Sequence, residues 1–499
     1  MTGIASIVLL GVAAQWLAWR LRVPSILLLL LIGFVAGPIT GWLDPDELLG
    51  NALFPVVSLS VAIIMLEGGL SLRFRDLRGV GGAVRNLILF GVPITWALTT
   101  VAARYILGFE LGLSFLLGAI LVVTGPTVII PLLRHVRPAG AIGSVVKWEG
   151  IVNDPIGAIL AVLVVQVILI AEVGKAATGT VIGALTAVFA GCLFGALAAG
   201  LLVLLLKHYL VPDFLQNPVA LMLAVGAFLA SNSVVHESGL LAVTLMGVLL
   251  ANQRFVVVEH IAEFKENLRV LLISSLFILL AARVPAEEFR SFEPRNLLFV
   301  VVLIVVVRPA TIFLATLGTS LSIAEKLFLS WMAPRGIVAA AVASVFAIEL
   351  AHSGYPAPER LVSVVFLVIV STVALYGLTA SFVARKLGLS QANPQGVLIL
   401  GAHSWARAVA AALKEAGFEV LLADTNRNKV RVAVMEGLDA HHGSVLAEEF
   451  QERVDLGGTG RMLALTSISG VNSLAALELA PIFGRSEVYQ LCADSDPTD

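Results

Sequence analysis

The chain has 499 residues, of which 59% are hydrophobic and 13% charged, and its mean hydropathy is +0.98. Soluble globular proteins carry about 25% charged residues, so this composition excludes an ordinary soluble protein and indicates a polytopic α-helical membrane protein. The formal net charge of -2 shows no basic excess and argues against a nucleic-acid partner, and two cysteines are too few for a disulfide framework.

Apolar runs long enough to cross a bilayer follow one another through residues 1–388, and we expect about thirteen transmembrane helices in this domain. The first run has no basic residue before it and no small-residue cleavage site after it, so we expect a retained helix rather than a signal peptide. The expected spans are residues 3–19, 24–41, 51–70, 84–103, 112–134, 141–171, 178–206, 217–235, 239–252, 267–284, 296–318, 323–350 and 359–384.

The loops between these runs alternate between basic and acidic composition. Lys and Arg concentrate in cytoplasmic loops, so the chain is expected to cross the cell's inner (plasma) membrane many times, with its N-terminus outside and its C-terminus in the cytoplasm. The basic loops contain Arg20 and Arg22, Arg73 to Arg85, Arg134 and Arg137, Lys207, Arg254 to Arg269, Lys326, and Arg385 with Lys386.

Two of the expected spans contain proline and glycine at mid-span. The fifth reads Val-Val-Thr-Gly-Pro-Thr over residues 122–127, and the twelfth reads Met-Ala-Pro-Arg-Gly over residues 332–336. Such breaks free backbone groups that lipid cannot satisfy, so they must line a cavity or meet another broken helix. Broken helices at matching places in two halves are typical of transporters built from inverted repeats, whose substrate site lies at the breaks.

Charged side chains that fall within apolar runs include Glu67, Glu149, Asp154, Arg308 and Arg335. A central charge costs roughly 2.5 to 3.5 kcal/mol on insertion scales, so each needs a partner, a cavity or a transported ion. Glu149 and Asp154 are five positions apart, which turns them about 140° from each other on a helix. We therefore expect Glu149 to pair with Arg335 as a structural ion pair, and Arg308 to be a further buried charge. Asp154 would then lack a cationic partner, which favours its protonated form.

These features together resemble the NhaP-type sodium/proton antiporters over about residues 1–388. The resemblance depends on the two broken spans, Asn153-Asp154, Glu67-Gly68-Gly69, the run Ser-Gly-Leu-Leu-Ala-Val at residues 238–243, and Arg335-Gly336.

The resemblance implies that Asp154 binds a monovalent cation, Na⁺ or K⁺, and a proton in turn, in electroneutral exchange. It also implies that Asn153 stabilises the site, that Glu149 pairs with Arg335, and that a mobile core works against a homodimeric scaffold. Further oxygen ligands are expected from the Thr124 carbonyl, the Thr127 hydroxyl and Glu67.

Two positions depart from the pattern of that family. Gly125 stands where many members have Asp, and Gly150 where they have Ser. Both lost side chains can be cation ligands in relatives, so the choice between Na⁺ and K⁺ stays open.

The composition changes after Lys386. A linker, residues 389–394, precedes residues 395–499, in which short apolar runs alternate with helical patterns. Strands are expected at 395–401, 419–423, 461–465 and 487–491, and helices at 405–416 and 429–436. This alternation predicts a cytoplasmic α/β domain with a doubly wound, Rossmann-like sheet.

A glycine turn follows the first of these strands in the sequence Gly-Ala-His-Ser-Trp-Ala at residues 401–406, and Asp424 lies about 20 residues further on. In a dinucleotide site such a turn binds phosphate through backbone N–H groups, and the acidic residue binds ribose. His403, however, stands where a second glycine would let phosphate approach.

With Gly443-Ser444, Leu465-Thr466 and Asn472, this pattern resembles the TrkA-N or RCK regulatory domains of potassium transport proteins. The resemblance implies a regulatory AMP, ATP or NAD(H), with no cofactor required for transport. The alternative is a scaffold that serves only for dimerisation. The implied nucleotide-binding residues are Gly401, His403, Ser404, Asp424, Thr425, Gly443 and Thr466.

Two other functions compete with antiport. A potassium efflux system or channel-like transporter gated by the C-terminal domain is one, although the sequence has no Thr-Val-Gly-Tyr-Gly filter. An enzyme that holds a hydride cofactor is the other, but no second catalytic domain follows the Rossmann-like segment, so we do not expect an enzyme.

Overall fold

The computed structural model describes residues 2–21, 23, 25–77, 79–125, 128–129, 132–133, 136, 142–169, 173–256, 259–283, 293–355, 358–389, 395–446 and 459–491. The chain divides into two compact units, and the second begins at Gly388. This boundary lies next to the predicted linker, of which Leu389 alone is described.

The first unit is helical throughout its described residues. Its elements are α1 (Thr2–Leu21), α2 (Ser25–Phe34), η1 (Val35–Ile39), α3 (Pro45–Leu49), η2 (Gly50–Ala52), α4 (Leu53–Leu70), η3 (Phe74–Leu77), α5 (Gly81–Asn86), η4 (Leu87–Gly91), α6 (Val92–Ala102), η5 (Ala103–Leu107), α7 (Leu111–Ile120), α9 (Ile142–Leu169), α10 (Val173–Lys207), α11 (Asp213–Asn232), α12 (Ser238–Asn252), α13 (Glu259–Ala282), α15 (Pro294–Val302), η6 (Leu303–Val307), α16 (Arg308–Ala315), α17 (Ile323–Trp331), α18 (Ile337–His352) and α19 (Glu359–Lys386).

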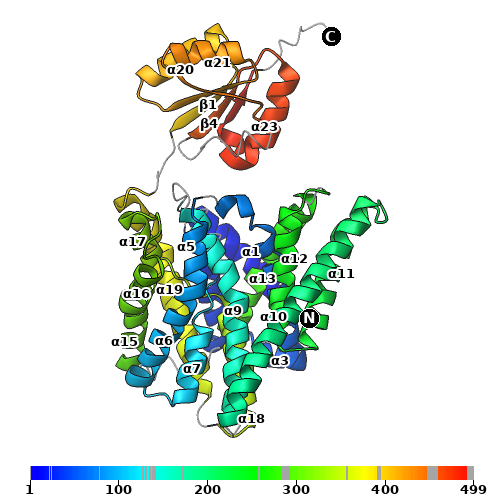
Figure 1. Ribbon diagram of the computed structural model, residues 1–499, viewed down its shortest axis with the longest axis vertical. Helices are drawn as coiled ribbons and strands as arrows, with labels where there is room; N and C mark the ends of the chain where they lie inside the picture. The colour runs from blue at the N-terminus through cyan, green and yellow to red at the C-terminus, as the bar shows by residue number, and fades with distance from the viewer. Residues whose placement is uncertain are drawn as a thin grey trace. The chain divides into compact units, whose positions relative to one another are not determined.

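Seven helical stretches among the described residues are long and apolar enough to cross a membrane. Shorter apolar helices accompany them, among them Leu111–Ile120 and Val338–His352, which flank the two predicted breaks. Figure 1 shows the long helices of this unit lying side by side. The helical membrane domain is therefore as predicted, while the number of thirteen spans stays a prediction.

The helices pack into two groups. In the first group, α12 packs against α4, α10 and α11, and α13 packs against α1, α2 and α4. In the second group, made of α5–α7, α9 and α15–α19, α7 packs on α6 and α9, and α18 packs on α9 and α19. Because α9 also packs on α10 and α12, it lies where the two groups meet (Figure 1).

Glycine allows α4 and α12 of the first group to approach at backbone distance. A Cβ atom at Gly69 would collide with the carbonyl oxygen of Thr244, and one at Gly247 with the carbonyl oxygen of Leu66. Small residues let membrane helices pack in this way. Gly69 of the Glu67-Gly68-Gly69 motif thus has a packing role beside the buried carboxylate.

The structure confirms that the fifth and twelfth expected spans are interrupted. Helix α7 ends at Ile120, and residues 121–125 are not helical. Helix α17 ends at Trp331, residues 332–336 are extended or irregular, and α18 begins at Ile337. By contrast, α9 continues without a break through Pro155. The inverted-repeat relation between the two breaks stays a prediction.

The second unit is a small α/β fold. Its elements are β1 (Gly396–Leu400), α20 (Ser404–Glu415), β2 (Val420–Asp424), α21 (Arg427–Met435), β3 (Asp439–His442), β4 (Thr459–Ala464), α23 (Ser469–Phe483), η7 (Arg485–Glu487) and β5 (Val488–Gln490). All strand pairs are parallel, in the order β3-β2-β1-β4-β5, as the sequence predicted for a doubly wound sheet. Apolar side chains of β1, such as Leu398 and Ile399, are buried on both faces of the sheet.

Glu237, in the turn between α11 and α12, makes a pH-dependent contribution to the stability of the first unit. Its φ is +64°, in the left-handed region, and burial raises the pKa of its carboxyl group to about 7. A carboxyl group whose pKa is raised on folding stabilises the fold below its unfolded pKa, and this contribution is lost as the pH rises through about 7.

We therefore expect Glu237→Gln to raise the melting temperature at pH 8 and to leave it nearly unchanged at pH 4, below the ordinary pKa of the carboxyl group. Thermal unfolding in detergent at both pH values tests this. Equal shifts of the melting temperature at the two pH values would show that the pKa of the carboxyl group does not differ between the folded and unfolded states.

Candidate functional site

The two breaks cross each other in the first unit. The backbone N–H of Gly125 donates a 3.0 Å hydrogen bond to the carbonyl oxygen of Pro334. A Cβ atom at Gly125 would lie 2.5 Å from Cα of Gly336. Since neither backbone can yield easily, only glycine fits here, and the backbone groups freed by one break are satisfied in part by the other.

Asp154 of α9 is completely buried, and within the described structure neither of its carboxylate oxygens has a hydrogen-bond partner. The adjacent Asn153 is also buried, with its Oδ1 atom unpartnered among the described residues. Leaving a buried acceptor unsatisfied costs about 1 to 3 kcal/mol, and more for a charged group. Three such oxygens on one turn of helix form a cluster that a proton or a cation can satisfy.

Thr124 brings the first break to this cluster. Its hydroxyl donates a 3.4 Å hydrogen bond to the carbonyl oxygen of Gly150, one turn before Asp154 on α9. The other predicted threonine ligand, Thr127, lies outside the described residues.

Arg335 places a buried positive charge at the second break. Its Nη1 atom donates to the carbonyl oxygens of Val122 and Val123, at 3.5 and 3.1 Å, and its backbone N–H donates to the Thr372 hydroxyl. Through these bonds Arg335 satisfies carbonyls of the opposite break, and its charge acts on Asp154.

Glu149 was predicted to pair with Arg335, but its partner in the structure is Arg308. Glu149 is bound in bidentate fashion by Arg308, whose Nη1 donates to Oε1 and whose Nη2 donates to Oε2 at 2.9 Å. Arg308 also donates to the carbonyl oxygens of Leu329 and Met332, at 3.0 and 2.9 Å. The guanidinium of Arg308 thus joins α9 to the end of α17. The guanidinium of Arg335 instead donates hydrogen bonds to the carbonyl oxygens of the opposite break.

Glu67 was predicted as an ion ligand, but its carboxylate is paired. Arg269 of α13 donates to Glu67 Oε1 at 2.6 Å, and both side chains are buried. The sequence placed Arg269 in a basic cytoplasmic loop. Its position directly before the apolar run 270–282 was the signal that it could be a buried partner for an intramembrane carboxylate.

The two departures from the family pattern have different structural consequences. A side chain at position 125 would displace the backbone of the opposite break, as the Gly336 contact shows. A Cβ atom at Gly150 would lie 2.5 Å from Cδ1 of Ile129, the flexible end of a side chain that can move. The first glycine is therefore required by this crossing, whereas the second is only accommodated by Ile129.

In the second unit, the predicted nucleotide residues gather at the carboxyl edge of the sheet. Gly401 follows β1 with φ of +105°, Asp424 ends β2, and Gly443 follows β3. Asp424 accepts hydrogen bonds from the backbone N–H groups of Ala402 and Asn426, both at 2.8 Å. Its carboxylate is thus already used in joining two turns of the protein.

The remaining predicted nucleotide residues lie on the same edge. Ser404 is the first residue of α20, and the carbonyl oxygen of Thr425 lies 2.9 Å from Nε2 of His442. Thr466 follows β4, and its hydroxyl and backbone N–H both donate to Oδ1 of Asn472.

The His403 imidazole fills the place where a phosphate would approach. Its Nε2 atom lies 2.6 Å from the carbonyl oxygen of Leu465, across the turn. Its Nδ1 atom accepts a 3.3 Å hydrogen bond from the N–H of Ala406 and so caps α20. An N–H group of this helix terminus that a phosphate would need is therefore engaged, and the residues as they stand do not fit a bound dinucleotide.

The helical unit matches a known family over most of its length. The family model for the sodium/hydrogen exchanger transmembrane domain covers residues 4–386 of the chain. The chain belongs to the sodium/hydrogen exchanger family. The match ends close to the boundary between the two compact units, so the family assignment rests on the helical unit, and the likeness of the α/β unit to TrkA-N or RCK domains stays a prediction.

Two antiporters are among the relatives of this chain. Na(+)/H(+) antiporter 1 of Methanocaldococcus jannaschii is 26% identical over 364 residues, which cover 70% of this chain and 84% of the relative. The K(+)/H(+) antiporter NhaP of Alkalimonas amylolytica is 27% identical over 397 residues, which cover 78% of this chain and 67% of the relative.

The fold of the helical unit also has a solved counterpart. The structure of the sodium proton antiporter MjNhaP1 from Methanocaldococcus jannaschii at pH 8 has a TM-score of 0.67 and 24% sequence identity. It covers 78% of this chain and 99% of that chain. The helical unit therefore has the fold of that antiporter, and the family match shows that the chain is a multi-pass membrane protein.

Proposed function

We propose that the chain is a secondary antiporter that exchanges protons for Na⁺ or K⁺ by binding them in turn at Asp154. The observation that carries the proposal is the cluster of three buried, unpartnered oxygens of Asn153 and Asp154 at the crossing of the breaks. Hard monovalent cations bind oxygen ligands, and a proton on the carboxyl group removes the same negative charge. The Thr124 carbonyl completes the ligand set in this proposal.

The proposed exchange is electroneutral. One carboxylate holds either one proton or one monovalent cation, and the charge of Arg335 is present in both cases. The loaded site therefore has the same charge in both directions of transport. An imposed membrane potential should then leave the exchange rate unchanged.

The test is proton flux in proteoliposomes that contain the purified full chain and an internal pH indicator. Addition of Na⁺, Li⁺ and K⁺ in turn should dissipate an imposed pH gradient for the transported ions, and choline should not. The order of rates identifies the substrate. Cation flux without proton movement would instead support the channel-like alternative.

Assembly and orientation belong to the same proposal. By resemblance we propose a homodimer in the inner membrane, with the N-terminus outside and the α/β unit in the cytoplasm. The basic residues of alternate loops support this orientation. A cysteine introduced at the exposed Leu210, between α10 and α11, in a chain without its two native cysteines, can be labelled in inside-out and right-side-out vesicles to show on which side of the membrane that loop lies.

Nucleotide regulation, which the glycine turn suggests, requires His403 to leave the turn. We expect His403→Gly to create binding of AMP, ATP or NADH, because it removes the imidazole and frees the N–H of Ala406. Glycine is tolerated at a helix N-cap at a cost of a few tenths of a kcal/mol.

Titration calorimetry on the full chain measures this gain. The control is His441→Gly, which removes an exposed histidine from β3. If wild type binds a nucleotide as tightly as the His403 variant, the imidazole is no obstacle and the interpretation of the turn is wrong.

A further inference from the structure

A cavity of about 310 Å³ lies where the two helix groups meet, away from Asp154. The first group contributes Asp46 of α3, Leu280 of α13 and Arg283, which directly follows α13. The second contributes residues of α18 and α19, including Ser344 and Glu359. Its volume is at the lower end of pockets that hold small molecules, which begin near 300 Å³.

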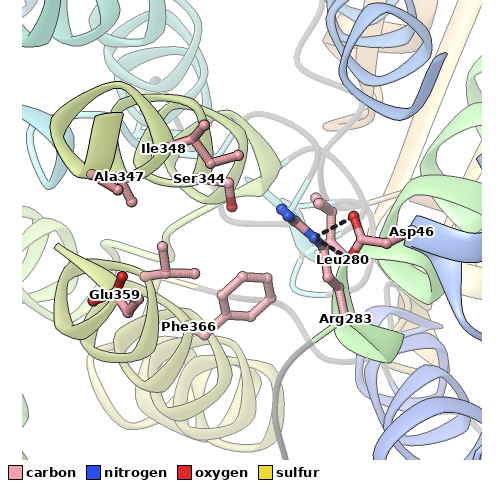
Figure 2. A pocket seen from close by; sticks show the side chains of 10 residues that line it. Asp46, Leu280, Arg283, Ser344, Ala347, Ile348, Glu359 and Phe366 are labelled. Carbon is pink, nitrogen blue, oxygen red and sulfur yellow. Dashed lines mark hydrogen bonds and ion pairs between the residues drawn. The ribbon is translucent and has the colours of Figure 1, made fainter. Parts of the chain in front are cut away.

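Arg283 is held so that its terminal nitrogens stay available. Its Nε atom donates to both carboxylate oxygens of Asp46, at 3.2 and 2.9 Å, and its guanidinium carbon lies 5.0 Å from the centre of the Phe54 ring. Within the described part of the chain, neither Nη atom has a hydrogen bond. Figure 2 shows these nitrogens directed into the cavity, towards the Ser344 hydroxyl. A fixed guanidinium fork beside a hydroxyl matches a phosphate or carboxylate.

Glu359, the first residue of α19, adds a negative charge to the same lining. Its carboxylate is exposed and has no ion pair among the described residues. The lining thus holds one guanidinium, paired through Nε with Asp46, and the further carboxylate of Glu359. A molecule with an anionic group and an ammonium group satisfies both, so the lining is suited to a zwitterion.

The position of the cavity indicates the source of the zwitterion. Arg283 follows the end of α13 and Glu359 begins α19, so the charges lie at the ends of membrane helices, at the level of lipid headgroups. The lining also contains apolar side chains, among them Leu280, Ile348 and Phe366. A lipid offers both kinds of group, a charged headgroup and carbon chains.

We propose that this cavity binds the headgroup of a zwitterionic phospholipid, phosphatidylethanolamine, with the phosphate on Arg283 and Ser344 and the ammonium on Glu359. A primary ammonium is favoured over choline because it donates hydrogen bonds to a carboxylate. The headgroup bridges the two helix groups, and α18 begins directly after the Gly336 crossing. Any effect of the bound lipid on the rate of ion exchange would rest on the proposed antiport function. The lipid binding itself does not depend on that function.

The test is native mass spectrometry of the detergent-purified full chain with phosphatidylethanolamine, phosphatidylcholine and phosphatidylglycerol. Wild type should retain phosphatidylethanolamine preferentially, and Arg283→Gln and Glu359→Gln should each weaken its retention at least tenfold, which corresponds to about 1.4 kcal/mol, because each variant loses a charged hydrogen bond to the headgroup. The matched control is Arg360→Gln. Arg360 lies 5.1 Å from the Phe109 ring centre and is outside the cavity lining.

A second measurement needs no variant. Soluble glycerophosphoethanolamine should displace phosphatidylethanolamine from wild type. Equal retention of the three lipids, or the same retention by Arg283→Gln as by Arg360→Gln, overturns the proposal. Binding of the soluble molecule without any retained lipid overturns the assignment to a lipid.

Discussion

Replacing Asp154 with Asn is expected to lower cation-dependent proton flux in proteoliposomes by on the order of 100-fold or more, because the variant loses the group that carries the proton. Asn has nearly the same shape but can neither release a proton nor neutralise a bound cation. The flux should stay low at every pH and for every cation tested. Asp154 makes no hydrogen bond to the described protein, so the substitution breaks no such contact.

The control for this variant is Asp213→Asn, the same chemical change at an exposed residue in the first turn of α11. Both variants should be produced in wild-type amounts and melt within a few degrees of wild type. If Asp154→Asn retains exchange at a rate near that of Asp213→Asn, another group carries the proton. The proposed role of Asp154 is then wrong.

The sequence predicted the location of the candidate site because its signals are local. Proline and glycine within an apolar run interrupt a helix wherever it packs, and both breaks lie where the sequence indicated. An aspartate in a membrane helix is costly unless it has a function, which singled out Asp154 before its surroundings were known. The parallel sheet of the second unit was predictable for a similar reason, since strands and helices alternate along the chain.

The pairing of charges was not predictable, because it depends on how distant helices are placed. Sequence alone offered Glu149 two arginines, and the choice of Arg335 came from its place in a break. In the structure, the Arg335 guanidinium donates hydrogen bonds to carbonyl oxygens of the opposite break, and Arg308 is the arginine that binds Glu149. Likewise, the ion pair between Glu67 and Arg269 forms because α13 lies against α4. No local pattern in the sequence predicts that these two helices are neighbours.

The side chain of His403 shows a third limit. The sequence indicated that a histidine stands where a glycine is usual, and it left open a regulatory nucleotide site or a scaffold that serves only for dimerisation. The structure adds that the imidazole lies 2.6 Å from the carbonyl oxygen of Leu465, a residue 62 positions away in sequence. Only the parallel pairing of β1 with β4 brings these two residues together.

Breaking the pair between Glu149 and Arg308 is expected to destabilise the helical unit severely. Glu149→Gln leaves the Arg308 guanidinium buried without a counter-charge, which costs about 3 to 5 kcal/mol in comparable sites. Arg308→Lys keeps the charge but loses the bidentate geometry and the bonds to the α17 carbonyls, so it should also destabilise. Melting temperature and yield in detergent measure both effects.

A double-mutant cycle distinguishes Arg308 from Arg335 as the partner of Glu149. Removing both members of a buried pair is often nearly neutral, so Glu149→Met with Arg308→Met should recover most of the stability that either single change loses. Glu149→Met with Arg335→Met should lose at least as much as the worse single variant, since Arg335 is bound by Val122 and Val123. Recovery in the second combination, and not in the first, would restore the pairing that the sequence suggested.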